Sequence, residues 1–140
     1  MPYAVQQDLV DRFGSAELID LTDRADPPAG AIDATVLGKA LDDADELIDS
    51  YIANRYDLPL ATVPAALVKI AADIASYYLF SDSPTEQVRD AFEDAVKLIK
   101  DISAGRAKLD VAGAEPAREG STIKTSAPAR VFTETNLKSF

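Results

Sequence analysis

The longest helical pattern in the chain is DATVLGKALDDADELIDSYIANRY, which occupies residues 33–56. Its apolar side chains recur every three or four residues, the spacing of one face of an α-helix. They are Val36, Leu37, Ala40, Leu41, Ala44, Leu47, Ile48, Tyr51 and Ile52. Asp33 suits the N-cap position, and at ~1.5 Å per residue the helix would be about 36 Å long. A small domain does not need this length, so we expect part of the helix to face neighbouring subunits.

Two short helices are predicted before this segment. Apolar residues recur at helical spacing over 5–13, and Ser15 is a suitable N-cap for a second helix over 16–21. Two prolines and a glycine within residues 22–32 predict a loop.

Two more helices are predicted after it, following an apolar connector at 57–63. Pro64 fits the first position of a helix that reaches about Phe80, and its wide apolar stripe suggests the centre of the bundle. After a turn at 81–84, the last helix runs to about Ala104 and Gly105 stops it. Its expected inner face consists of Val88, Ala91, Phe92, Ala95, Leu98, Ile99 and Ile102. The predicted fold class is therefore all-α, a small helical bundle with one long central helix and an extended C-terminal arm.

The charge distribution supports a division into a helical domain, residues 1–105, and a flexible arm, residues 106–140. Residues 1–105 carry 8 basic and 20 acidic side chains, a net charge of -12, whereas residues 106–140 carry 6 and 4, a net charge of +2. The arm is rich in small and polar residues and regains apolar character near its end. The apolar and basic tip, a candidate partner-binding element, contains Arg130, Val131, Phe132, Leu137 and Phe140.

Composition excludes several classes of function. The 140-residue chain has a net charge of -10, which disfavours general binding to nucleic acid. It lacks both cysteine and histidine, so disulfides, thiolate metal sites and the commonest general base are excluded. We see no signal peptide and no apolar run near the ~20 residues of a membrane span. We expect a cytoplasmic protein that is not an enzyme, needs no cofactor and does not enter a membrane.

An acidic cluster on the long helix is open to more than one interpretation. It comprises Asp42, Asp43, Asp45, Glu46 and Asp49. Pairs spaced three apart share a helix face and could form a metal or acid/base site, but the cluster itself contains no histidine or basic residue to tune them. A solvated acidic face is the simpler reading.

The segment before the long helix resembles part of a calcium-binding loop, with Gly30 at the glycine position. The ligand positions before it hold Ala25, Pro27 and Ala29, whose side chains cannot coordinate an ion.

The end of the long helix is a candidate interface. Tyr51, Arg55 and Tyr56 could anchor a partner, because Tyr and Arg are enriched at binding hot spots. The alternative is a plain helix end in which Arg55 satisfies the last carbonyl groups. Asp73, within the most apolar helix, is expected to form an ion pair with Arg89, Arg55 or Arg12.

A resemblance to a known family extends over most of the chain, through motifs that are individually weak but ordered and spaced alike. Its N-terminal part consists of Tyr3, Ala4, Asp8, Leu9, Arg12, Phe13, Gly14, Glu17, Leu18, Leu21, Thr22 and Asp23. The middle part consists of Ala40, Leu41, Ala44, Ile48, Asp49, Tyr51, Arg55, Tyr56, Leu58, Pro59, Leu60, Val63, Pro64, Leu67, Asp73, Ile74, Ala75 and Tyr77. The last part consists of Arg130, Val131, Phe132, Thr133, Leu137, Lys138 and Phe140. These residues resemble a family of Mu-like phages and prophages, encoded among head morphogenesis genes and similar to head–tail connector (adaptor) proteins.

The resemblance implies a structural virion protein of the phage neck, assembled in the cytoplasm of the host. Such proteins form a ring, typically of about twelve subunits, beneath the portal. Implied partners are other copies of the chain, the portal protein and tail-side neck proteins, while DNA passes without specific binding. An acidic lumen face formed by the cluster on the long helix would suit that passage. The family supplies no catalytic residues, and Pro27-Pro28 depart from its more acidic, glycine-rich loop.

Two other classes of function remain open from the sequence. One is an acidic regulatory module that binds proteins, as a DNA mimic or an antitoxin does. The other is a metal-dependent hydrolase that uses Asp42, Asp45 and Glu46. A self-assembled ring would favour the connector over both.

Overall fold

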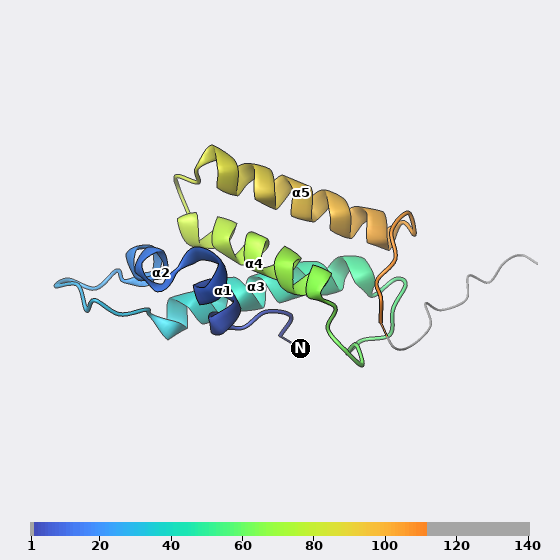
Figure 1. Cartoon of the computed structure of the whole chain (residues 1–140), viewed down its shortest axis with the longest axis horizontal. Coiled ribbons are helices and arrows are strands. Elements are labelled where there is room, and N and C mark those ends of the chain that lie inside the picture. Colours follow the sequence, from blue (N-terminus) through green and yellow to red (C-terminus); the bar gives the residue numbers. More distant parts are fainter. Residues whose placement is uncertain (1, 112–140) are drawn as a thin grey trace, which may run out of the picture.

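The computed structural model describes residues 2–111, which form five helices and no strand. The helices are α1 (Gln6–Phe13), α2 (Ser15–Thr22), α3 (Ala34–Ile52), α4 (Ala65–Phe80) and α5 (Glu86–Ser103). In Figure 1, α3, α4 and α5 lie alongside one another, with α4 running opposite to the other two, while α1 and α2 pack near the start of α3. The predicted all-α class is confirmed.

Helix α3 begins where predicted but ends four residues early. The Asp33 carboxylate accepts hydrogen bonds from the Thr35 and Val36 N–H groups at 2.8 and 3.2 Å. At the other end, the Ile52 carbonyl accepts from both Arg55 and Tyr56, so the chain turns out of the helix. The helix has 19 residues and is about 28 Å long. The expectation that part of this helix faces neighbouring subunits rested on the longer estimate, and it stays a prediction.

Helix α4 lies at the centre of the bundle, as its wide apolar stripe predicts. It packs against all four other helices. The longest helix is α3, so the long helix and the central helix are two different elements. Its buried residues are Leu67, Ile70, Ala71, Ala72, Ile74, Ala75, Ser76 and Leu79. Pro64 precedes the helix instead of occupying its first position, and its carbonyl accepts from the Leu67 and Val68 N–H groups.

Helix α5 covers one side of α4 and is capped by Thr85, whose hydroxyl accepts from the Val88 N–H at 3.3 Å. Ala95, Ile99 and Ile102 are buried as predicted. Leu98 is 40% exposed, so its assignment to the inner face is wrong. Leu98 is rotated by about 100° around the helix axis from the buried Ile99, which turns its side chain away from the core.

The segment between α1 and α3 is held by local hydrogen bonds. Gly14, with a φ of +86°, separates α1 from α2, and Ser15 is the first residue of α2 and not its N-cap. The buried Thr22 hydroxyl donates to the Leu18 carbonyl and accepts from the Asp33 N–H at 3.0 Å, which ties the end of α2 to the start of α3.

The loop that resembles a calcium site is closed by a protein carboxylate. Asp23 accepts from the N–H groups of Ala25, Ala29 and Gly30 at 3.4, 3.2 and 2.7 Å. These bonds lower the pKa of Asp23, and the bond from the Gly30 N–H has the largest effect. The Pro27-Pro28 loop is thus organised around Asp23, in a way that needs no ion.

The packed body continues beyond the predicted boundary at Gly105. Arg106 pairs with Asp101 at 2.6 Å, and the side chain of Leu109 is buried. Ala107 and Val111 also pack against the core. Residues 106–111 therefore belong to the body and not to the arm.

Candidate functional site

The acidic cluster on α3 does not form one exposed face. Asp42 and Glu46 are exposed, Asp49 is half-buried and Asp45 is only 8% exposed. These four residues and Pro2 line a hollow of about 380 Å³. Asp43 lines a different hollow of about 250 Å³, together with Arg24, Lys39, Tyr78 and others. The prediction of a single acidic face is wrong for Asp43, because it projects from another side of the helix.

Two carboxylates of the cluster hold the N-terminal segment. The Tyr3 N–H donates to the Asp45 carboxylate at 3.1 Å, and the Tyr3 hydroxyl donates to Asp49. Burial raises the pKa of Asp45; the Tyr3 N–H opposes this, while Asp49 and Asp42 raise it further. Burial, and then Asp49, raise the pKa of the Tyr3 hydroxyl well above its usual value. Asp45 and Asp49 are thus engaged in holding the chain together.

The geometry gives no support to a hydrolase built on Asp42, Asp45 and Glu46. Within residues 2–111, no group of three or more acidic side chains is placed to hold a metal ion. Asp45 is nearly enclosed and already accepts the Tyr3 N–H.

The predicted interface at the end of α3 is partly internal. Tyr56 is 4% exposed, and its hydroxyl accepts from the Leu109 N–H at 3.1 Å. The Arg55 guanidinium lies against Gly105, where a Cβ atom would stand 2.6 Å from Arg55 Nη1. Both residues therefore contact the chain that follows α5. Tyr51 is half-buried. The tip residues Arg130, Val131, Phe132, Leu137 and Phe140 lie outside the described residues.

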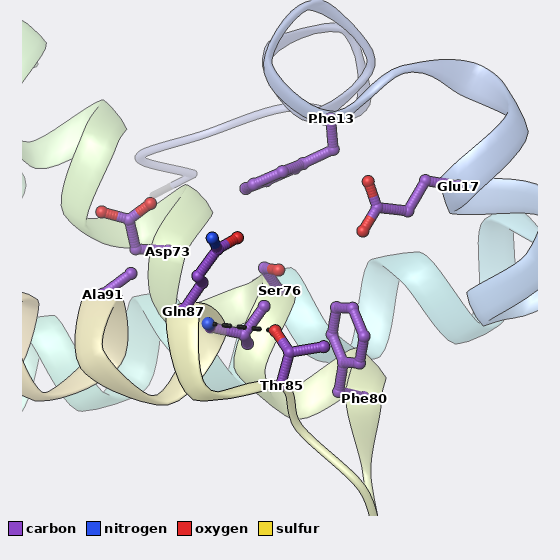
Figure 2. A pocket seen from close by; sticks show the side chains of 9 residues that line it. Phe13, Glu17, Asp73, Ser76, Phe80, Thr85, Gln87 and Ala91 are labelled. Atoms are coloured by element: carbon purple, nitrogen blue, oxygen red, sulfur yellow. Dashed lines mark hydrogen bonds between the residues drawn. The ribbon is translucent and has the colours of Figure 1, made fainter.

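A hollow of about 310 Å³ lies where α1, α2, α4 and the start of α5 meet. It is lined by Phe13, Glu17, Asp73, Ser76, Phe80, Thr85, Gln87, Val88 and Ala91. Figure 2 shows Phe13 and Glu17 reaching over it from one wall, with Ser76, Phe80 and Gln87 on the other. Asp73 pairs with Lys69 at 2.5 Å and not with any of the three arginines that were expected. We call this site the α1–α5 hollow.

Sequence patterns missed the α1–α5 hollow because its residues come from four helices. Phe13 and Phe80 each stand at the last position of a helix, where an apolar residue is easily taken for ordinary core. The sequence signal that could have pointed to these two residues is that Gly14 and Ser81, which end α1 and α4, follow them directly.

The family described as "Bacteriophage Mu, Gp36" matches residues 3–126. The chain belongs to this Gp36 family. The match covers the five helices and residues 106–111, and it ends before the tip residues 130–140.

Two relatives support this membership of the Gp36 family. The "Mu-like prophage FluMu protein gp36" of Haemophilus influenzae is 35% identical over 107 residues, which are 76% of this chain and 74% of the relative. "Gene product J" of Escherichia phage Mu is 35% identical over 106 residues, with the same shares covered. This Gp36 family member is therefore a protein of a Mu-like phage or prophage.

In residues 2–111 of this Gp36 family member, no helix combines the length and the apolar character that crossing a bilayer requires.

The first prediction concerns the buried charge of Asp45. Asp45→Asn keeps an oxygen acceptor for the Tyr3 N–H and removes a desolvated carboxylate beside Asp49. At pH 7 we expect an unfolding free energy equal to or above that of the wild type, within about 1 kcal/mol. The folded-state pKa of Asp45 lies above 3.8, the ordinary value for an aspartate. As the pH falls from this raised pKa toward 3.8, the folded state takes up the proton first, so the wild type gains stability relative to the variant.

Urea unfolding between about pH 4 and pH 7 measures this difference. Asp42→Asn, at an exposed position of the same helix, serves as the control and should show a smaller dependence on pH. A difference between wild type and Asp45→Asn that does not change with pH would contradict the assignment.

The second prediction concerns the bond between Tyr56 and Leu109. Tyr56→Phe leaves the buried Leu109 N–H without its acceptor, which should cost about 1–2 kcal/mol. Hydrogen exchange of the Leu109 amide should accelerate. Tyr51→Phe is the matched control and should leave that amide protected; equal protection in both variants would refute the role of Tyr56.

Proposed function

We propose that this protein is a structural protein of the virion of a Mu-like phage or prophage, where it joins head to tail as a connector. In this proposal it forms a ring of its own copies below the portal, at the neck. The observation that carries the proposal is membership of the Gp36 family across residues 3–126. The motif-level resemblance to head–tail adaptors points to the same place in the particle.

The surface charge is compatible with a ring around DNA. Asp42 and Glu46 are exposed on α3, and Asp49 is half-buried beside them. A lumen lined by such carboxylates would repel the phosphate backbone and let DNA slide without adhesion. The Asp45 carboxylate, being buried, would contribute less to this lining.

Contacts between subunits need apolar or aromatic surface, and the described body offers some. Leu98 on α5 is 40% exposed and Val5 before α1 is 51% exposed. Tyr51 on α3 is half-buried and can contribute an aromatic contact. Portal and tail-side neck proteins are the remaining partners that we propose.

The proposal is tested by the mass of the full chain in solution. Light scattering over a concentration series, with negative-stain images, should detect closed rings, either free or after addition of the portal protein of the same phage. A chain that stays monomeric and also fails to bind the portal would refute the connector role. A tight complex with an unrelated basic host protein, without rings, would favour the regulatory alternative.

The third prediction concerns Leu98. Leu98→Gln should weaken self-association, in free solution or on the portal, because it removes apolar area from a subunit contact. The expected loss is about 1 kcal/mol per contact, and the thermal midpoint of the body should change little. Lys97→Gln, at the neighbouring exposed position, is the control. Identical association of both variants would exclude α5 at Leu98 from the interface.

A further inference from the structure

The α1–α5 hollow combines aromatic walls with negative charge. Phe13 and Phe80 line it, and both are only half-buried. Glu17 and Asp73 bring two carboxylates, and none of the nine lining residues is basic. Asp73 is paired with Lys69, whereas no hydrogen bond or ion pair within residues 2–111 engages the exposed Glu17. A ligand that fits these walls is apolar and carries positive charge.

The chain itself contains a segment with that chemistry. Residues 130–140 hold the apolar side chains Val131, Phe132, Leu137 and Phe140. They also hold two basic residues, Arg130 and Lys138, against one acidic residue, Glu134. An aromatic side chain could fill the space between Phe13 and Phe80, and a basic one could meet Glu17 (Figure 2). The segment therefore complements the hollow in both polarity and charge.

The length of the intervening chain allows the contact. Helix α5 starts at the hollow and runs away from it for 18 residues, about 27 Å. Figure 1 shows that the chain after α5 turns down beside the connection between α3 and α4, at the other end of the body. The 18 residues from 112 to 129 can extend by roughly 60 Å. This reach exceeds the length of α5, so it suffices for the hollow of the same copy.

We propose that the α1–α5 hollow is the docking site for residues 130–140 of this protein. Phe132 or Phe140 enters between the two aromatic walls, and Arg130 or Lys138 lies toward Glu17. The site serves one segment of this chain and does not depend on the connector role.

Cross-linking tests the proposal directly, because the full chain has no native cysteine. Gln87→Cys places a thiol at the rim of the hollow, and Ser139→Cys places one in the docking segment. The double variant should react with a short bismaleimide about tenfold faster than the matched pair Glu93→Cys with Ser139→Cys. Glu93 is exposed on the same helix but does not line the hollow. Equal rates in the two pairs would overturn the proposal.

Mixing the single-cysteine proteins identifies which copy supplies the segment. A cross-linked dimer shows docking between copies, and a cross-link confined to the double variant shows docking within one copy; both support the site. If rings form without any preference for position 87, the docking proposal fails and the connector role stands. If the preference is present but the chain neither assembles nor binds the portal, the docking proposal stands and the connector role fails.

Two further variants check the chemistry of the contact. Phe132→Ala with Phe140→Ala should reduce the rate to that of the Glu93 pair, and these positions lie outside the described body. Glu17→Lys should lower it by up to about fivefold, the effect of an exposed ion pair, whereas Asp20→Lys on the same helix should not. An undiminished rate in the double Phe variant would overturn aromatic docking. Circular dichroism of each variant verifies that the body remains folded.

Discussion

Packing of α4 against all four other helices is the constraint on which the rest of the structure depends. The helix is apolar around most of its circumference, so it is stable only where other elements cover it. Ala71, Ala72 and Ala75 let neighbouring helices approach closely, while Ile70 and Ile74 fill the larger spaces. α3 and α5 cover most of the buried face of α4, and α1 and α2 also pack against it.

Polar contacts then fix the ends of the described chain on the body. At the beginning, Tyr3 is held by Asp45 and Asp49 of α3. At the other end, the Leu109 N–H donates to Tyr56, just after α3. These bonds join residues that are 42, 46 and 53 positions apart. Packing alone is not directional, so such bonds determine where each end lies.

Periodicity and capping predicted the helices, because these signals are local. The Asp33 cap, the loop at 22–32 and the central place of α4 all follow from residues near one another in sequence. Tertiary contacts decided the rest. α3 ends at Ile52 and the chain turns, with Tyr56 buried, although the apolar pattern continues. The partners of Asp45 and the walls of the α1–α5 hollow come from distant segments, which no local pattern reveals.

The contact between Tyr56 and Leu109 has a mechanical consequence for anything attached to the chain beyond Val111. Gly105 reverses the chain after α5, with the Arg55 guanidinium against it, and Leu109 is anchored beside the turn that follows α3. A pull on the downstream chain would load that anchor before it reached the last turn of α5. The load would act on the connection between α3 and α4, in the middle of the polypeptide, and would not unfold the bundle helix by helix from its C-terminal end. Among the described residues, the junction of α3 and α4 is therefore the point at which such a load would first be taken up.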